Sequence, residues 1–538
     1  MSVTSLPFRS FVDDILDSLG VAPAHEALVH QGRRITAGQL RGLVHRLAHA
    51  LRAQGLGRGQ TVTLLSGNLP EALAARYAAN LVGCQVNHLY NKLSADAQAA
   101  IVRDVETQAL IVDPAYAEQA AEVIAQAPVP HVLTLGVSKL GTDLLELAAA
   151  ESAEPISGLA RPGDICSIRH TGGTTGHPKG ICTSFERAGR MPRTPRGEEA
   201  ALPRQLVATT LAHGAGLIAD HLLAEGGTVV LLDAFDPGQV LAAIERERIT
   251  HLYLLPPLLY RLVDHPDAGR TDTSSLRQLI YGGCQASPAR IADAIRRFGP
   301  ILLQGYGQTE SGSISVLGPQ DHDPDRPERL RSAGRVLDGV EVAIRDTDGH
   351  DLPHGEHGEI CVRSQHVMQG YWKQPELTAE VLRDGWLHTG DVGFLDNEGY
   401  LTIVDRIKDM IVVVGGHVYT TELEDLLNSH PQVLQSAVFG VHDSDRTEQV
   451  HAVVVRAPDA EVDAGELRAM VRKQRGDMYE PARITFAEQL PLTDTGKPDK
   501  KLLRTRTAQA KRGQPALHRG TGFRPGPSVA PAGTGQHR

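Results

Sequence analysis

A segment rich in glycine, threonine and lysine, TGGTTGHPKG, occupies residues 171–180. It follows a short apolar run, 164–168, that is typical of a strand. Glycine lets backbone N–H groups turn toward a bound anion, threonine hydroxyls add donors, and Lys179 supplies positive charge. The spacing is not the Walker A pattern, because a His-Pro pair separates Gly176 from Lys179 and no Ser or Thr follows the lysine. The segment predicts a polyphosphate loop of another kind; a solvated linker is the alternative.

Four further short motifs contain residue types that nucleotide chemistry needs. Carboxylates accept hydrogen bonds from hydroxyl groups and hold Mg²⁺, and lysine and arginine neutralise phosphates. In chain order the motifs are Tyr306-Gly-Gln-Thr-Glu310, Trp386-Leu-His-Thr-Gly-Asp391, Asp405-Arg-Ile-Lys408 and Leu490-Pro-Leu-Thr-Asp-Thr-Gly-Lys497.

Together with the loop, this ordered set resembles the motifs of the adenylate-forming superfamily, which contains acyl-CoA synthetases, adenylation domains of non-ribosomal peptide synthetases and beetle luciferases. The loop is similar to the family signature (S/T)(S/G)G(S/T)TGxPKG, and the resemblance covers roughly residues 10 to 505. The chain is most like an acyl-CoA or aryl acid–CoA ligase. The resemblance implies an ATP-dependent ligase that activates a fatty or aromatic carboxylate as acyl-AMP, releases pyrophosphate, and forms a thioester with coenzyme A.

The resemblance also implies which residues bind the nucleotide. Threonines of the loop and Lys179 are expected at the β- and γ-phosphates, Tyr306 against the adenine, and Asp391 at both ribose hydroxyls. Arg406 is expected to support the ribose and phosphate side, and Lys408 to be the pivot of a hinge. The full predicted set is Thr171, Gly172, Gly173, Thr174, Thr175, Gly176, Lys179, Gly282, Gly283, Cys284, Tyr306, Gly307, Asp391, Arg406 and Lys408.

Four residues are expected to take part in the reaction itself. By resemblance, Lys497 bridges the attacking carboxylate and the α-phosphate, Thr309 contacts that phosphate, and Glu310 holds Mg²⁺. His213 matches a position beside the acyl pocket, where it controls access of the substrate; a purely structural histidine is the alternative. No base is paired with Cys284, so we predict a small pocket wall there and not a nucleophile.

The elements that must position these motifs change in type along the chain. Strand-like runs alternate with helical patterns through the first two thirds, as where the run 61–65 precedes the helix 70–79. The pattern predicts a helix over 240–248 and another over 464–475. We therefore predict an α/β fold with a parallel sheet architecture in the N-terminal part.

We expect two domains joined by a hinge. The large N-terminal adenylation domain is predicted over 1–404, with a β-rich subdomain at about 334–404 where turns rich in Gly, Asp and Pro separate short strands. The hinge is predicted at 405–408, a small mobile α+β domain at 409–505, and a disordered tail at 506–538. In the family this small domain rotates about the hinge between the two half-reactions, so the resemblance implies domain alternation.

The segment after the hinge departs from the pattern of aryl-acid ligases. Val412 stands where a lysine is common, His417 replaces an amide residue, and Thr420 replaces a proline. The adenylation motifs are intact, whereas residues associated with the thiol acceptor are altered. Two alternatives to coenzyme A follow: transfer of the acyl group to a carrier protein or an amine, and ATP-dependent activation of nitrite for diazotisation of an aromatic amine.

Composition excludes several other classes. The chain has 538 residues, which is too long for one hydrophobic core, and a formal net charge of −10 with no basic patch, so no nucleic acid is expected as a partner. Its five cysteines form no CxxC pair, and its N-terminus lacks a signal peptide, so we predict a cytoplasmic enzyme with no membrane span. No GxGxxG motif opens a helix after an early strand, which excludes a dehydrogenase; a non-catalytic nucleotide-binding protein is a further alternative.

Overall fold

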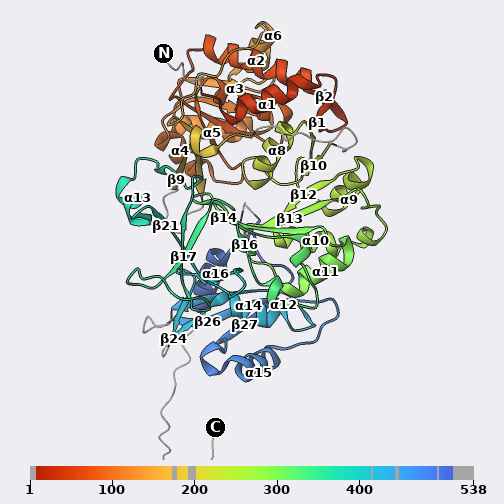
Figure 1. Cartoon of the computed structure of the whole chain (residues 1–538), viewed down its shortest axis with the longest axis vertical. Coiled ribbons are helices and arrows are strands. Elements are labelled where there is room, and N and C mark those ends of the chain that lie inside the picture. The colour runs from red at the N-terminus through yellow and green to blue at the C-terminus, as the bar shows by residue number, and fades with distance from the viewer. Residues whose placement is uncertain are drawn as a thin grey trace, which may run out of the picture.

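The computed structural model describes residues 8–171, 179–191, 202–413, 416–442, 448–493 and 496–512. The elements run from the N-terminal helices at one end of the molecule to the C-terminal α+β elements at the other (Figure 1). Most of the glycine- and threonine-rich loop, 172–178, lies outside the described residues.

The first sheet has eight strands in the order β19-β9-β8-β4-β3-β5-β6-β7. Strands β3, β4, β5, β6 and β8 run parallel, as the alternation of strands and helices predicts. The strands are β3 (Thr61–Leu65), β4 (Gln85–His88), β5 (Thr107–Val112), β6 (His131–Thr134), β7 (Thr142–Asp143), β8 (Ile165–Thr171), β9 (Lys179–Ser184) and β19 (Gly370–Tyr371). The helices along this part of the chain are α3 (Pro70–Leu81), α4 (Ala95–Asp104), α5 (Ala117–Gln126), α6 (Leu144–Ala149) and α7 (Phe185–Ala188).

The second sheet has nine strands in the order β16-β15-β14-β13-β12-β10-β11-β1-β2, with a parallel centre and antiparallel edges. Its strands are β1 (Glu26–His30), β2 (Arg33–Thr36), β10 (Arg204–Val207), β11 (Thr228–Leu231), β12 (His251–Leu254), β13 (Gln278–Gly282), β14 (Leu302–Gln308), β15 (Gly312–Leu317) and β16 (Arg335–Val336). The accompanying helices are α1 (Phe11–Val21), α2 (Ala37–Ala53), α8 (Gly214–Ala224), α9 (Pro237–Arg246), α10 (Pro256–Val263), α11 (Pro288–Phe298) and α12 (Pro327–Leu330).

A smaller antiparallel sheet follows, where short strands separated by turns predict a β-rich part. Its strands are β17 (Glu341–Arg345), β18 (Gly358–Arg363), β20 (Leu382–Arg383), β21 (Trp386–Leu395) and β22 (Leu401–Arg406), and α13 (Pro375–Val381) lies among them. Strand β22 ends at Arg406, so the first half of the predicted hinge belongs to a strand.

The C-terminal part has the expected α+β composition. A hairpin of β23 (Ile411–Val413) and β24 (Gly416–Val418) precedes a three-stranded sheet of β25 (Val433–His442), β26 (Glu448–Arg456) and β27 (Arg483–Ala487). Helices α14 (Thr420–Asn428) and α15 (Ala464–Arg475) contribute Leu427 and Leu467 to a core that includes Val454. The final helix, α16 (Lys500–Arg512), continues into the segment predicted as a disordered tail, so that prediction is wrong for 506–512.

The predicted helix bounds agree best with the structure where capping residues mark the helix ends. The helix over 464–475 is confirmed residue for residue; Asp463 caps its first turn by accepting a hydrogen bond from the backbone N–H of Glu466. The helix predicted over 240–248 begins earlier, at Pro237, because Asp236 supplies the N-cap and proline fits the first turn. Within the described ranges, no helix has the length and apolar character needed to cross a membrane.

Candidate active site

Asp391 is the most completely held carboxylate of the site. It lies in β21, directly opposite Arg406 of β22, and is 3% exposed. The Tyr306 hydroxyl donates a hydrogen bond to Asp391 Oδ2 at 2.8 Å, and Gln308 Nε2 donates to the same oxygen at 2.7 Å. Arg406 Nε lies 3.1 Å from the other oxygen, Oδ1. This arrangement fixes the carboxylate: two donors already fill the positions on Oδ2, so Oδ1, with Arg406 as its one partner, has room for a further hydroxyl group.

A tight turn between β14 and β15 presents Thr309 and Glu310. The turn is closed so closely that a Cβ atom on Gly307 would lie 2.2 Å from the carbonyl oxygen of Gly312, a contact that only glycine avoids. Strand β14 is longer than the predicted apolar run and carries Tyr306 inside it, where burial, followed by Asp391, raises the pKa of the tyrosine well above its usual value.

Lys179 and Glu310 meet at Tyr371. The ammonium group of Lys179 lies 5.3 Å from the centroid of the Tyr371 ring, and the Tyr371 hydroxyl donates to Glu310 Oε1 at 3.3 Å. Strand β8 ends at Thr171, which pairs with Lys179 across an antiparallel ladder. The ends of the predicted phosphate loop are therefore fixed beside Glu310, while Gly172, Gly173, Thr174, Thr175 and Gly176 lie outside the described residues.

The predicted glycine-rich strand end lies where β13 and β14 approach each other. A Cβ atom on Gly282 would lie 2.3 Å from the Gly305 carbonyl oxygen, and Gly283 has a φ of +84°, so neither position accepts a side chain without a shift of the backbone. Burial raises the pKa of the neighbouring Cys284 thiol to about 12. A thiol with that pKa is not a nucleophile at neutral pH, which supports the predicted role as a pocket wall.

Lys497 reaches this site from the C-terminal part of the chain. Its Cε atom is 3.9 Å from a Cβ atom built on Gly283, and the preceding Gly496 faces Leu255 and Leu258 in the same way at 3.7 and 3.9 Å. Burial, followed by Arg406, lowers the pKa of the Lys497 ammonium group. The structure therefore brings Lys497 to the same site as Asp391 and Glu310, both of which interact with it electrostatically.

His213 precedes α8 and stacks on Tyr90. The ring centroids are 4.7 Å apart with an interplanar angle of 13°, and the Tyr90 hydroxyl lies 3.4 Å from His213 Nδ1. Burial, together with the positive charges of Arg169 and Lys497, lowers the pKa of His213 to about 4. Its Nε2 atom is buried and has no hydrogen-bond partner among the described residues. A neutral imidazole with an unused nitrogen is compatible with either alternative, so control of substrate access by His213 stays a prediction.

The predicted hinge is tied to the C-terminal part by a buried network. Asp405 accepts hydrogen bonds from the Thr420 backbone N–H at 2.5 Å and the Thr420 hydroxyl at 3.2 Å, and burial raises its pKa to about 6. Lys500 Nζ donates to the same hydroxyl at 2.9 Å. Burial, followed by Arg406, lowers the pKa of Lys408, and Lys179 adds to this effect. Lys408 is thus close enough to Arg406 and Lys179 to be affected by their positive charges.

Several residues of the site escape the motif analysis. Gln308 lies within the motif that contains Tyr306 and Glu310, so its contact with Asp391 could have been anticipated. Tyr371 follows no motif, and only the pairing of β19 with β9 brings it to Lys179. Tyr90 lies two residues beyond β4 and stacks on His213, and Arg169 of β8 acts on His213 electrostatically; sequence spacing gives no sign of either interaction.

Two clusters in the described part of the chain contain three potential metal ligands each, and Glu310 belongs to neither. They are Glu359, Cys361 and His388, and Asp346, Asp348 and His350. In the first, an Arg383 nitrogen lies 2.7 Å from His388 Nδ1, so the positive charge of the arginine already occupies the place of a cation. A single carboxylate such as Glu310 suits Mg²⁺ that is shared with nucleotide phosphates and water.

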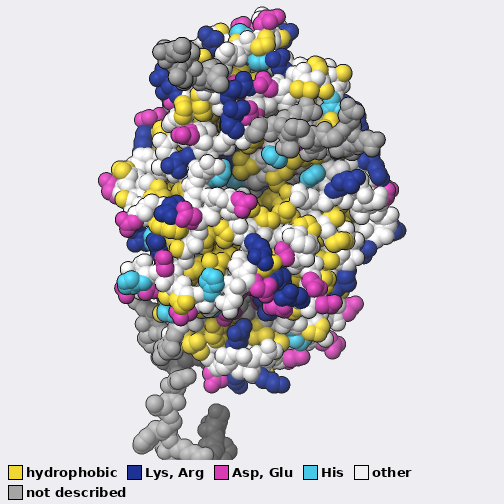
Figure 2. Space-filling view, viewed as in Figure 1, with side chains coloured by type: hydrophobic (Ala, Val, Ile, Leu, Met, Phe, Trp, Pro, Cys, Tyr) yellow, Lys and Arg dark blue, Asp and Glu magenta, His cyan; other side chains and the backbone are white. Residues whose placement is uncertain are grey.

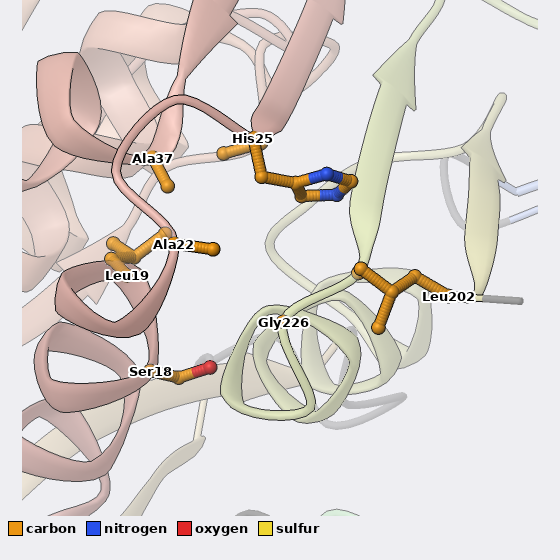
Figure 3. Close-up of a pocket in the computed structure, with 9 residues that line it drawn as sticks. Ser18, Leu19, Ala22, His25, Ala37, Leu202 and Gly226 are labelled. Carbon is orange, nitrogen blue, oxygen red and sulfur yellow. The ribbon is translucent and has the colours of Figure 1, made fainter. Parts of the chain in front are cut away.

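Hydrophobic side chains gather across the middle of one face of the molecule, with charged side chains around them (Figure 2). A separate small pocket lies beside α1 and the end of α8 (Figure 3). Its lining contains none of the predicted site residues and consists of Ser18, Leu19, Ala22, His25, Ala27, Ala37, Leu202, Gly226 and Gly227.

The two large sheets, the β-rich part and a C-terminal lysine at a carboxylate-lined site together define an adenylate-forming enzyme. The AMP-binding enzyme family matches residues 17–372, and the AMP-binding enzyme C-terminal domain matches residues 422–497. The chain belongs to the AMP-binding enzyme family, and it is an ATP-dependent ligase of that family.

Similar proteins act on different acids and acceptors. A medium/long-chain-fatty-acid–CoA ligase of Mycobacterium tuberculosis is 38% identical over 88% of this chain and 86% of its own length. A feruloyl-CoA synthase of an Amycolatopsis species is 35% identical over 89% and 95%. Among solved structures, the amide bond synthetase McbA of Marinactinospora thermotolerans is 39% identical, with a TM-score of 0.83 over 92% of this chain and 99% of that one. ATP-bound MatB of Rhodopseudomonas palustris is 26% identical, with a TM-score of 0.82 over 93% and 100%.

Proposed function

We propose that the protein activates a small-molecule carboxylate as an acyl adenylate, with release of pyrophosphate, and transfers the acyl group to coenzyme A. The observation that carries this proposal is the position of Lys497 beside Gly283, within electrostatic range of Asp391 and Glu310. A carboxylate is a poor electrophile because attack on it must expel oxide, and esterification to AMP supplies a good leaving group. Lys497 offers a cation where two anions, the carboxylate and the α-phosphate, must approach each other.

The same geometry supports the nucleotide roles that we propose. Tyr306 and Asp391 form one unit, so a nucleotide whose adenine lies against Tyr306 would bring its ribose hydroxyls to the Asp391 carboxylate. Lys179 and the loop that it closes suit the outer phosphates, and Thr309 suits the α-phosphate. Mg²⁺ fits beside Glu310, where it would neutralise charge on the phosphate oxygens.

Domain movement is part of the proposal. The region 1–404 would act as the adenylation domain, 405–408 as the hinge with Lys408 as its pivot, and 409–505 as the mobile domain. Lys497, at its place beside Gly283, would serve the adenylation step, and the hairpin that carries the 54%-exposed Val412 would serve the second step. All five cysteines are free, which supports a reducing cytoplasmic location.

An amine is the second candidate acceptor. The amide bond synthetase matches nearly the full chain at 39% identity, and Val412, His417 and Thr420 depart from the pattern of aryl acid–CoA ligases. A carrier-protein thiol would use the same acyl adenylate. Activation of nitrite for diazotisation of an aromatic amine would retain the ATP site and change the oxyanion.

One assay separates these possibilities. Purified full-length protein is given ATP, Mg²⁺ and a panel of carboxylic acids, and pyrophosphate release is measured with coenzyme A, with an amine, or with neither. We expect acid-dependent release in all three cases and an acyl-CoA product, identified by mass, when coenzyme A is present. Release that requires nitrite and an aromatic amine, and that ignores acids and coenzyme A, would refute the proposal. So would ATP binding without turnover.

A further inference from the structure

The C-terminal part of the chain meets the wall of the candidate active site at two places. At the first, Lys497 lies beside Gly283, and the preceding Gly496 faces Leu255 of α10. At the second, the side chain of Asp425 in α14 makes polar contacts with residues that precede the predicted hinge. Both places join residues from opposite sides of the hinge, so a large rotation about it would separate them.

Asp425 faces away from the core of the C-terminal part. Helix α14 packs leucines such as Leu427 into that core, whereas the Asp425 carboxylate is directed toward the N-terminal part. Arg331 Nε lies 3.4 Å from Asp425 Oδ2, and Gln285 Nε2 donates to the same oxygen at 3.5 Å, which is long for a hydrogen bond. Helix α12, which Arg331 follows, thus lies next to α14 (Figure 1).

The carboxylate is more deeply buried than the arginine that pairs with it. The Asp425 side chain is 10% exposed, and that of Arg331 is 47% exposed. Burial raises the pKa of Asp425 to about 7, Arg331 acts in the opposite direction, and Glu424 and Glu422 of the same helix raise the pKa further. Without Arg331, this arrangement of the two parts would bury a carboxylate that has lost its ion-pair partner, which is unfavourable.

We propose that Arg331 is a positioning residue for adenylation: its ion pair with Asp425 holds the C-terminal part, and with it Lys497, over the candidate active site. The inference rests on the proposed function, because it names a residue that favours the arrangement in which the acid is activated. Arg331 lies outside the motifs of the site, so it acts through the placement of Lys497 and not on the substrates. Its removal makes a rotated arrangement, with the Asp425 carboxylate in water, relatively more favourable.

The pair predicts an asymmetry that a general loss of stability would not produce. Removal of Arg331 alone leaves a buried charge unpaired, whereas removal of both charges leaves nothing to compensate. Arg331→Met should therefore slow adenylation, and adding Asp425→Asn to the same chain should restore it. Asp425→Asn alone removes a buried charge and should not slow adenylation.

The test measures the two half-reactions in the full-length protein. Acid-dependent ATP–pyrophosphate exchange reports on adenylation, and thioester formation from a synthetic acyl adenylate and coenzyme A reports on the second step. The variants are Arg331→Met, Arg331→Lys, Asp425→Asn and the double variant Arg331→Met/Asp425→Asn. Arg326→Met is the matched control, because the Arg326 side chain is 50% exposed and its ion pair with Glu328 lies within the N-terminal part.

We expect Arg331→Met to lower the rate of ATP–pyrophosphate exchange about 3- to 10-fold, a modest loss because the arginine is half exposed, and not to slow the second step. Arg331→Lys and Arg326→Met should retain most of the exchange, and the double variant should come within about 2-fold of the wild type. Unchanged exchange in Arg331→Met, equal losses in both half-reactions, or a double variant as slow as Arg331→Met would overturn the inference while leaving acid activation intact.

Hydrogen–deuterium exchange keeps the inference testable if no acid supports ATP–pyrophosphate exchange. Arg331→Met should speed deuterium uptake in the segment 282–287, which Asp425 and Lys497 contact, and the double variant should reverse this change. Strand β26, in the core of the C-terminal part, should take up deuterium as in the wild type. That pattern would support the inference even though acid activation had failed. Equal uptake in the wild type and Arg331→Met, or faster uptake that includes β26, would refute a positioning role.

Discussion

Replacement of Lys497 by alanine should separate catalysis from folding. The ammonium group lies beside Gly283, and burial, followed by repulsion from Arg406, lowers its pKa. Because the folded state disfavours the charged form, removing Lys497 should leave the protein as stable as the wild type at pH 7, or slightly more stable. The adenylation step should suffer instead, because no other cation is expected to bridge the carboxylate and the α-phosphate.

The magnitude follows from what the lysine supplies. Loss of one preorganised group that stabilises transition-state charge lowers kcat by roughly 100- to 1,000-fold. The lowered pKa of Lys497 also predicts a pH dependence. The adenylation rate of the wild type should decline as pH rises through that pKa, because the ammonium form is required. Lys497→Arg retains charge over the whole range, so whatever activity remains should lose this alkaline decline.

The assay measures the two half-reactions separately. Acid-dependent ATP–pyrophosphate exchange reports on adenylation, and thioester formation from a synthetic acyl adenylate and coenzyme A reports on the second step. Lys497→Ala should abolish most of the exchange and spare the second step, while Lys501→Ala, an exposed neighbour, should change neither. Equal losses in both steps, or unchanged exchange, would refute the placement of Lys497 at the adenylation site.

Three further changes test other parts of the structure. Tyr371→Phe removes the hydrogen bond to Glu310, which is worth about 1 kcal/mol, so kcat/KM for ATP, measured over a range of Mg²⁺ concentrations, should fall about 5-fold. An unchanged value would show that Tyr371 does not support the predicted metal ligand. Asp220→Ala leaves Arg76 buried without its partner and should lower the free energy of unfolding, measured in urea, by about 3–5 kcal/mol. The double variant Asp220→Leu/Arg76→Met removes both charges and should lower it less. Burial raises the pKa of Asp425 to about 7, so the folded state loses stability as pH rises from about 4 to 7. Asp425→Asn should therefore melt progressively above the wild type between pH 5 and pH 8, and a constant difference would contradict this.

The order of elements could be predicted because local rules set most of their ends. Proline at the first turn of α3 and the Asp463 cap of α15 are visible in the sequence, and both helices begin where these residues place them. The extension of α16 to Arg512 was missed because its charged, weakly apolar sequence resembles that of a tail. Sheet order was also out of reach, since pairs such as β1 with β11 join segments far apart in the chain.

The residues of the site also fall into those that the sequence predicts and those that it does not. Residues carried by compact motifs, such as Tyr306, Asp391 and Lys497, are brought together as the resemblance implies. Arg169 and Tyr371 were not predicted, because each reaches the site through strand pairing and not through a motif. Their contacts depend on long-range packing, about which periodicity and spacing carry no information.

The charge of the site is opposite to that of the whole chain, and this explains how two anions can meet there. The protein carries a formal net charge of −10, yet burial and neighbouring cations lower the pKa values of Lys408, Lys497 and Arg169 together. Burial is the largest cause of each shift, and a neighbouring arginine adds to it. A triphosphate and a carboxylate bound beside these groups would favour their charged forms, so substrates should stabilise the fold. Stabilisation by ATP should accordingly weaken as ionic strength rises, although the overall negative charge of the chain alone would predict the reverse.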